Sequence, residues 1–136
     1  MTAVLPTRRL YDSTDSLLRF ALRADATLTG VCGLVIAVAA GPLSSLTGLP
    51  SGVEYGLAAF FVLYGLFVMG LAALADLRRV GVGVVAANIA FTVAAVAAAE
   101  ALSMTPIGVA ASLASAIYTA AFAGLQYQGV RRLETA

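Results

Sequence analysis

Four apolar stretches, each close to the length that crosses a lipid bilayer, dominate this sequence. A transmembrane helix needs about 20 mostly apolar residues. The chain has 136 residues, of which 61% are hydrophobic and only 11% are charged, whereas a soluble domain carries about 25% charged residues. We therefore predict an all-α fold, an integral membrane four-helix bundle. The predicted transmembrane helices cover residues 25–46, 53–75, 80–102 and 107–127.

The charged stretch Asp76-Leu77-Arg78-Arg79 divides the apolar sequence into two halves. Each half holds two apolar stretches joined by a short turn, so each is predicted to form a helical hairpin. The halves also share a spacing, because Tyr64 precedes Arg78 by 14 residues and Tyr118 precedes Arg132 by the same 14. Both hairpins would begin on the same side of the membrane, which suggests a parallel repeat.

The arginines predict the orientation of the chain in the membrane. They lie at the N-terminus, between the second and third predicted spans, and at the C-terminus, while the other two loops have none. The positive-inside bias then places both termini in the cytoplasm. The absence of lysine, with heavy use of Ala, Val and Gly, is typical of a GC-rich bacterial genome. We expect a multi-pass protein of the bacterial cytoplasmic (inner) membrane. The expected cytoplasmic anchors are Arg19, Arg23, Arg78, Arg79, Arg131 and Arg132.

Residues 10–22 have an amphipathic pattern that allows two interpretations. They form either a short helix lying in the cytoplasmic headgroup layer or the first turns of the first span. Asp12 or Ser13 could cap this helix. Asp25 follows close to Arg19 and Arg23, so we expect a solvated, paired carboxylate at the inner interface.

Two features mark the outer side of the first hairpin. Gly41-Pro42 predicts a kink or an end in the first span, since proline cannot continue the backbone hydrogen bonding of a helix. Ser51 and Glu54 fit a capping box at the start of the second span. Glu54, like Glu100 at the end of the third span, is a candidate outer acidic residue, and a cation or substrate role for Glu54 is the alternative to capping.

Polar residues near the middle of the predicted spans form the main candidate site. Polar groups at this depth must find partners in the protein, because hydrocarbon offers none. They would act either as hydrogen-bonding links between helices or as a polar pocket for a small molecule or lipid headgroup. The candidate intramembrane polar cluster consists of Tyr64, Asn88, Thr92, Ser115 and Tyr118.

Small residues predict where helices pack closely, within the chain or between copies of it. Close packing in lipid uses glycine and alanine at intervals of about one helical turn. Such residues occur on the third and fourth predicted spans. The predicted contact residues are Gly81, Ala95 and Ala99 on the third span, and Ala116, Ala120 and Gly124 on the fourth.

Residue types that carry most enzyme chemistry are missing from the sequence. It has no histidine and no lysine, and Cys32 is its sole cysteine. We therefore predict no catalytic residue, no metal site and no cofactor. A net charge of +1 without a basic tract argues against a nucleic-acid partner. The predicted function is a non-catalytic structural or accessory role, as a homo-oligomer or with another membrane protein. The alternative is a small oligomeric transporter or channel for an ion or a small or lipidic molecule.

One segment carries a resemblance to known proteins. Its residues are Arg23-Ala24-Asp25-Ala26 with Gly30, then Ala40-Gly41-Pro42-Leu43, Leu46 and Gly48-Leu49-Pro50. They resemble the first hairpin of small, uncharacterised bacterial four-span integral membrane proteins. The resemblance covers the first two spans and the loop between them. It implies a four-span membrane fold and carries no activity over to this chain.

Overall fold

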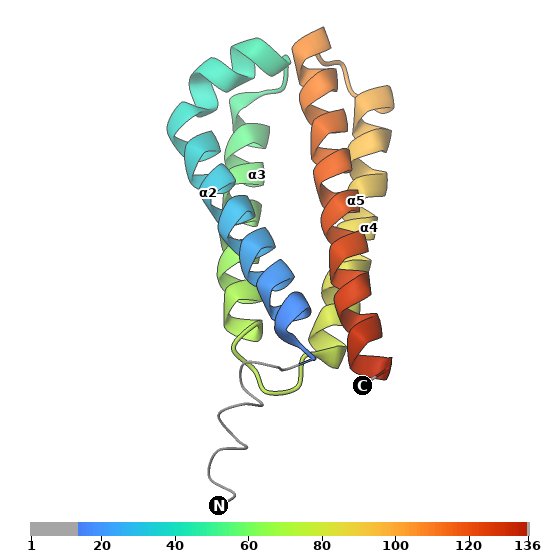
Figure 1. The fold of residues 1–136 in the computed structure, drawn as a ribbon. Coiled ribbons are helices and arrows are strands. Elements are labelled where there is room, and N and C mark those ends of the chain that lie inside the picture. The colour runs from blue at the N-terminus through green and yellow to red at the C-terminus, as the bar shows by residue number, and fades with distance from the viewer. Residues whose placement is uncertain (1–13, 136) are drawn as a thin grey trace, which may run out of the picture.

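The computed structural model describes residues 14–135. Over these residues the chain is all-α, without a strand. Each helix is long and apolar enough to cross a membrane, by length and composition. The helices are α2 (Ser16–Thr47), α3 (Ser51–Leu71), α4 (Arg78–Ala101) and α5 (Pro106–Thr135). They lie side by side, with the α2–α3 and α4–α5 turns at one end, here called the outer end (Figure 1). The α3–α4 loop lies at the opposite, inner end.

The helix boundaries differ from the predicted ones chiefly at the inner end. The helix α2 begins at Ser16, so residues 16–22 are its first turns rather than a separate interfacial helix. Leu18 and Leu22 are fully buried there, because this face packs against protein instead of the headgroup layer. Residues 10–13, with the proposed caps Asp12 and Ser13, lie outside the described residues. The helix α3 stops at Leu71 instead of 75, and α5 continues to Thr135 instead of 127.

The predicted kink in the first span is present, slightly before the proline. Ala39 has non-helical backbone angles, with φ −106° and ψ 15°, while the helix resumes and includes Pro42. Proline lacks the N–H that would bond to the carbonyl four residues earlier, and its ring crowds that carbonyl. The outer part of α2 therefore bends away from the axis of its inner part (Figure 1).

The predicted capping box at the start of α3 is wrong. The N-cap residue is Pro50, and no side chain caps the helix. Glu54 is buried and accepts a hydrogen bond of 2.6 Å from the hydroxyl of Thr47, at the end of α2. This contact turns the Glu54 carboxylate toward α2, so it does not reach back to the amide of Ser51.

The first hairpin packs its two helices through glycines. A Cβ atom at Gly65 of α3 would lie 2.7 Å from the carbonyl oxygen of Ala26, and one at Gly33 of α2 would lie 2.8 Å from the carbonyl oxygen of Ala58. Side chains cannot be accommodated at such distances, so glycine lets the two backbones approach.

The two hairpins contact each other near both of their ends. At the outer end, the amide of Thr105 donates a 2.9 Å hydrogen bond to the carbonyl of Thr47. At the inner end, Leu18 fills the space beside Gly81 and Gly129, where a Cβ would approach it to 2.8 Å. An apolar core surrounds this inner contact, and its buried members are Leu18, Leu22, Ala26, Val68, Ala72, Leu77, Val84 and Val130. The middle of the bundle lies between these two contacts.

The predicted small-residue contacts are divided between the inside and the outside of the bundle. Gly81, Ala95 and Ala116 are buried. Gly124 is exposed, and a Cβ there would meet nothing within 4 Å in the chain, so it is not an internal helix contact. Gly129, further along α5, is buried and packs against Leu18.

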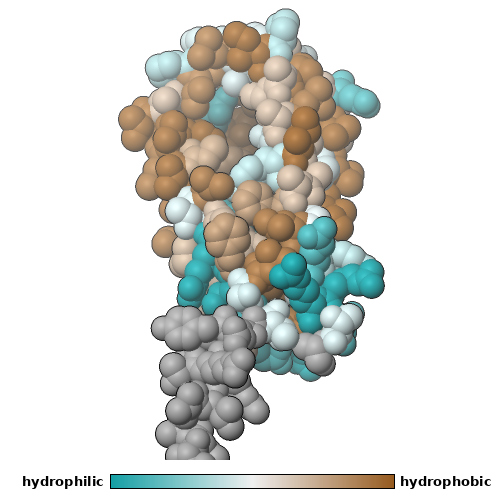
Figure 2. All heavy atoms as spheres, viewed as in Figure 1, coloured by the Kyte–Doolittle hydropathy of each residue, from teal (hydrophilic) through white to brown (hydrophobic). Residues whose placement is uncertain are grey.

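Hydrophilic residues gather at the inner end of the bundle, and an apolar belt lies next to them (Figure 2). Arg19 is more than a surface anchor: it pairs with Asp15 at 2.8 Å and donates to the backbone carbonyls of Ala72 and Leu74, just beyond α3. Arg78 pairs with Glu134 at 3.2 Å, linking the start of α4 to the end of α5.

Candidate functional site

Asp25 is the centre of the polar interior. Its side chain is completely buried, so the expectation of a solvated carboxylate paired with arginine at the interface was wrong. Asp25 continues the buried face of α2 that includes Leu18 and Leu22, and this geometry points it into the bundle. Arg23 is exposed, and Arg19 is engaged by Asp15.

Hydrogen-bond donors from all four helices converge on the Asp25 carboxylate. Its Oδ1 atom accepts from the hydroxyls of Thr29 and Tyr118, each at 3.1 Å. Its Oδ2 atom accepts from the Tyr64 hydroxyl at 2.8 Å and from the side-chain amides of Asn88 and Gln126, each at 2.9 Å. A buried carboxylate is tolerable only when it is hydrogen-bonded in this way.

The structure brings three of the five predicted cluster residues together on this carboxylate: Tyr64, Asn88 and Tyr118. Thr92 belongs to a neighbouring pair, since its hydroxyl lies 2.6 Å from that of Thr119 and donates to the carbonyl of Asn88. The remaining predicted residue, Ser115, donates to a carbonyl of its own helix.

The predicted outer acidic residues lie apart from this network. Glu54 is buried against Thr47 at the outer end of α2, and Glu100 is exposed near the end of α4. Neither of them is hydrogen-bonded to a member of the central cluster, within the part of the chain that the structure describes.

Sequence reasoning missed Asp25, Thr29, Thr119 and Gln126. The spacing of these residues indicates which of them share a helix face. Thr29 lies one turn beyond Asp25, and Thr119 and Gln126 are seven residues apart, so each pair shares a helix face. Gln126 lies at the inner end of the predicted fourth span, and it is fully buried and binds both Asp25 and Asn88.

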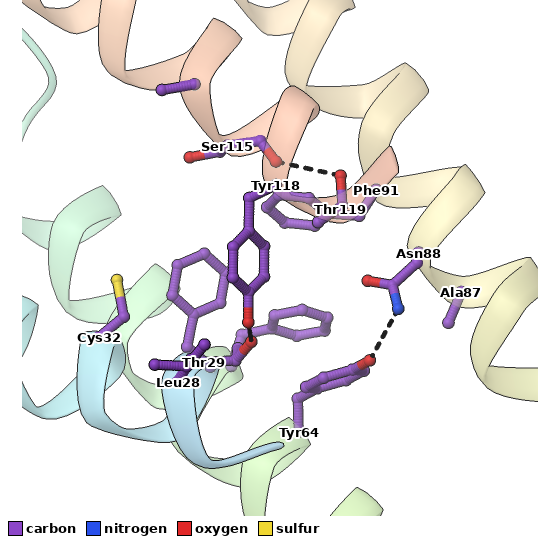
Figure 3. Close-up of a pocket in the computed structure, with 13 residues that line it drawn as sticks. Leu28, Thr29, Cys32, Tyr64, Ala87, Asn88, Phe91, Ser115, Tyr118 and Thr119 are labelled. Carbon is purple, nitrogen blue, oxygen red and sulfur yellow. Dashed lines mark hydrogen bonds between the residues drawn. The ribbon is translucent and has the colours of Figure 1, made fainter. Parts of the chain in front are cut away.

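A cavity of about 300 Å³ lies between the hairpins, on the outer side of this network. All four helices line it (Figure 3). Aromatic rings form much of its wall: the ring centroid of Phe91 lies 5.6 Å from that of Phe61 and 6.4 Å from that of Phe60. The polar lining residues are Thr29, Tyr64, Asn88, Ser115, Tyr118 and Thr119.

The cavity opens on the side of the bundle. Leu28 and Phe60, which line it, are each more than half exposed, while the contacts at Thr47 and Leu18 close the bundle at either end. The surface is hollowed between the hairpins in its apolar part (Figure 2). A molecule entering by this route would pass between exposed apolar side chains such as Leu28 and Phe60.

The site has the elements of a binding pocket. The amide and hydroxyl groups of its lining can orient a ligand, and its rings can pack against one. Within residues 14–135, no three His, Cys, Asp or Glu side chains lie close enough to hold a metal ion. Comparison of the chain with protein families, with curated proteins and with solved structures finds no match.

Proposed function

We propose that this chain is a non-catalytic, multi-pass protein of the bacterial cytoplasmic membrane that binds a small, largely apolar molecule between its two hairpins. The observation that carries the proposal is the side-opening cavity of about 300 Å³ with aromatic walls and a polar base. Small-molecule sites are typically concave, mostly apolar and supplied with a few placed polar groups. In helical bundles they lie between helices.

The membrane location is supported by the outward-facing side chains. Val38 is 90% exposed, Ile117 71% and Leu66 68%. Large apolar side chains in a belt this continuous suit lipid, since a water-soluble protein rarely exposes such a surface. Among residues 14–135 the arginines lie only at the inner end, which supports cytoplasmic termini. The ligand would then enter from the bilayer, as expected for a carrier or transporter of a lipidic molecule.

The binding test uses a tryptophan reporter, because the natural chain has no tryptophan. Phe91→Trp places the reporter on the cavity wall, and Phe67→Trp places it on the exposed surface of α3. Both variants are titrated with propylbenzene in lipid nanodiscs. We expect saturable fluorescence changes at position 91 and only a linear, partition-like response at position 67.

A filled cavity provides the control for this experiment. Ala87 lines the cavity, while Ala90 lies one turn further on the same helix and is exposed outside it. Ala87→Phe should abolish the saturable response of the reporter at position 91, and Ala90→Phe should leave it intact. A linear response in the unfilled protein, or an unchanged one after Ala87→Phe, would overturn the proposal.

The second candidate is an accessory role through association with another copy or another membrane protein. The observation in its favour is the small-residue face of α5 at Ala120 and Gly124, which is exposed and unfilled in the single chain. Small residues at such spacing let helices of separate chains approach closely. If this face is an interface, Gly124→Leu should lower the oligomer mass in nanodiscs without changing the thermal unfolding of the monomer.

A further inference from the structure

The hydroxyl groups that line the cavity have their protons directed into the protein. Tyr64, Tyr118 and Thr29 donate to the carboxylate of Asp25. The hydroxyl of Ser115 donates to the carbonyl of Ala111. A hydroxyl has one proton and two acceptor lone pairs. What these groups retain for a ligand is therefore acceptor capacity.

Asn88 presents its side-chain oxygen to the cavity as a further hydrogen-bond acceptor. Its amide nitrogen donates to Asp25 Oδ2 and to Gln126 Oε1, each at 2.9 Å, which uses both of its hydrogens. The carboxylate can only accept, so the nitrogen must face it and the orientation of the amide is determined. The Asn88 oxygen points toward the cavity (Figure 3). Among the described residues no group donates to it.

The carboxylate of Asp25, which lies behind the polar residues of the cavity lining, is not balanced by a cation. Within residues 14–135, the ion pairs join Arg19 to Asp15 and Arg78 to Glu134, and none involves Asp25. Its carboxylate is held by neutral donors alone. In an interior of low dielectric, a positive charge placed close to it would be attracted strongly.

The walls of the cavity suit a cation as well. Phe60, Phe61 and Phe91 form one cluster of rings, and Tyr64 stacks on Phe60 with ring centroids 6.4 Å apart. The face of an aromatic ring carries negative charge density and attracts ammonium groups. An apolar ligand body would pack against the same rings.

We propose that the ligand of this cavity is an organic amine, bound as the ammonium ion with its N–H groups facing Asn88 and the tyrosine oxygens and its apolar body against the phenylalanines. This inference rests on the proposed binding function and names its substrate class. It follows from three independent features of the cavity: acceptors without free hydroxyl protons, an unbalanced carboxylate beneath them, and aromatic walls.

The test is a series of four ligands that share a phenyl ring and differ in the end group. 2-Phenylethylammonium carries charge and donors, 2-phenylethanol carries one neutral donor, propylbenzene carries neither, and 3-phenylpropanoate carries the opposite charge. Each is titrated into the Phe91→Trp protein in nanodiscs of neutral lipid, and the response of Phe67→Trp is subtracted as partitioning. We expect the ammonium to bind about tenfold more tightly than propylbenzene, the alcohol to be intermediate and the carboxylate not to bind.

The outcomes separate the two proposals. If propylbenzene or 3-phenylpropanoate binds as tightly as the ammonium, the amine inference is wrong while the binding function stands. If no member of the series saturates, both are wrong. Asp25→Asn in the reporter background should reduce the roughly tenfold preference for the ammonium over propylbenzene to about onefold. An ammonium preference that survives Asp25→Asn unchanged would overturn the role given to the carboxylate.

Discussion

Tyr64 and Tyr118 bind the two different oxygen atoms of one carboxylate, at 2.8 Å and 3.1 Å. They occupy matching positions in the two hairpins, each 14 residues before an arginine of the inner end. Asp25 belongs to only one hairpin, so equivalent tyrosines make unequal contributions: Tyr64 closes a contact within its own hairpin, and Tyr118 joins the second hairpin to the first.

Replacing Asp25 by alanine should destabilise the fold strongly. The variant loses five hydrogen bonds, and at an average of about 0.6 kcal/mol for a bond within a membrane protein this amounts to roughly 3 kcal/mol. The free energy of unfolding can be measured in mixed micelles with increasing fractions of dodecyl sulfate. Glu100→Ala removes an exposed acid and should change it by no more than about 0.5 kcal/mol. Equal effects of the two substitutions would contradict the central role of Asp25.

The glycines of α5 should differ sharply in their response to alanine. At Gly129 a Cβ would lie 2.8 Å from Leu18, whereas at Gly124 it meets nothing within 4 Å. We expect Gly129→Ala to cost about 1–3 kcal/mol through overpacking, and Gly124→Ala to be neutral or stabilising by up to about 1 kcal/mol through helix propensity. Thermal unfolding followed by circular dichroism compares the pair. Tolerance of alanine at position 129 would mean that the hairpins do not meet there.

Arg19 should stabilise the inner end more than its neighbour Arg23 does. Arg19 binds Asp15 and two backbone carbonyls beyond the end of α3, while Arg23 is exposed. Arg19→Gln should therefore lower the free energy of unfolding by about 1–2 kcal/mol, and Arg23→Gln by less than about 0.5 kcal/mol. Hydrogen exchange at the amides after Leu71 should increase only in the Arg19 variant; an increase in both would assign the effect to net charge.

The orientation of the chain can be tested with single cysteines. Ser45 and Ser103 are exposed near the outer turns, and Thr135 is exposed at the other end. Each is replaced by cysteine in a Cys32→Ser background, and intact cells are treated with a thiol reagent that cannot cross membranes. The outer positions should be labelled and position 135 should stay unlabelled until the cells are opened. The reverse pattern would place the termini outside.

Periodicity and length were sufficient to predict four helices and the kink near Pro42, because both depend on local features of the chain. Helix ends were predicted less well. The extension of α5 from residue 127 to Thr135 lies beyond the apolar run that predicted the fourth span. In this extension Gly129 packs against Leu18 and Val130 belongs to the inner apolar core, and hydropathy alone does not show such tertiary contacts.

The polar site was predicted only in part for a related reason. Tyr64, Asn88 and Tyr118 stood out because they interrupt long apolar stretches. Asp25 did not, since it follows Arg23 and a local ion pair seemed sufficient. Such an acid can turn toward the basic residue or into the bundle, and the outcome depends on which face of its helix is buried. In α2 the buried face is the one that carries Leu18 and Leu22. That information comes from contacts with residues about a hundred positions away.

The long separation between Asp25 and its partners affects how the protein can be made. Gln126 lies 101 residues beyond Asp25 in the chain, so the first helix is synthesised long before its carboxylate has a complete set of donors. An aspartate in an isolated span is costly to insert into lipid. If the chain spans a membrane as proposed, this cost is offset only after α5 has been made, because the last helix completes the hydrogen bonds of the first.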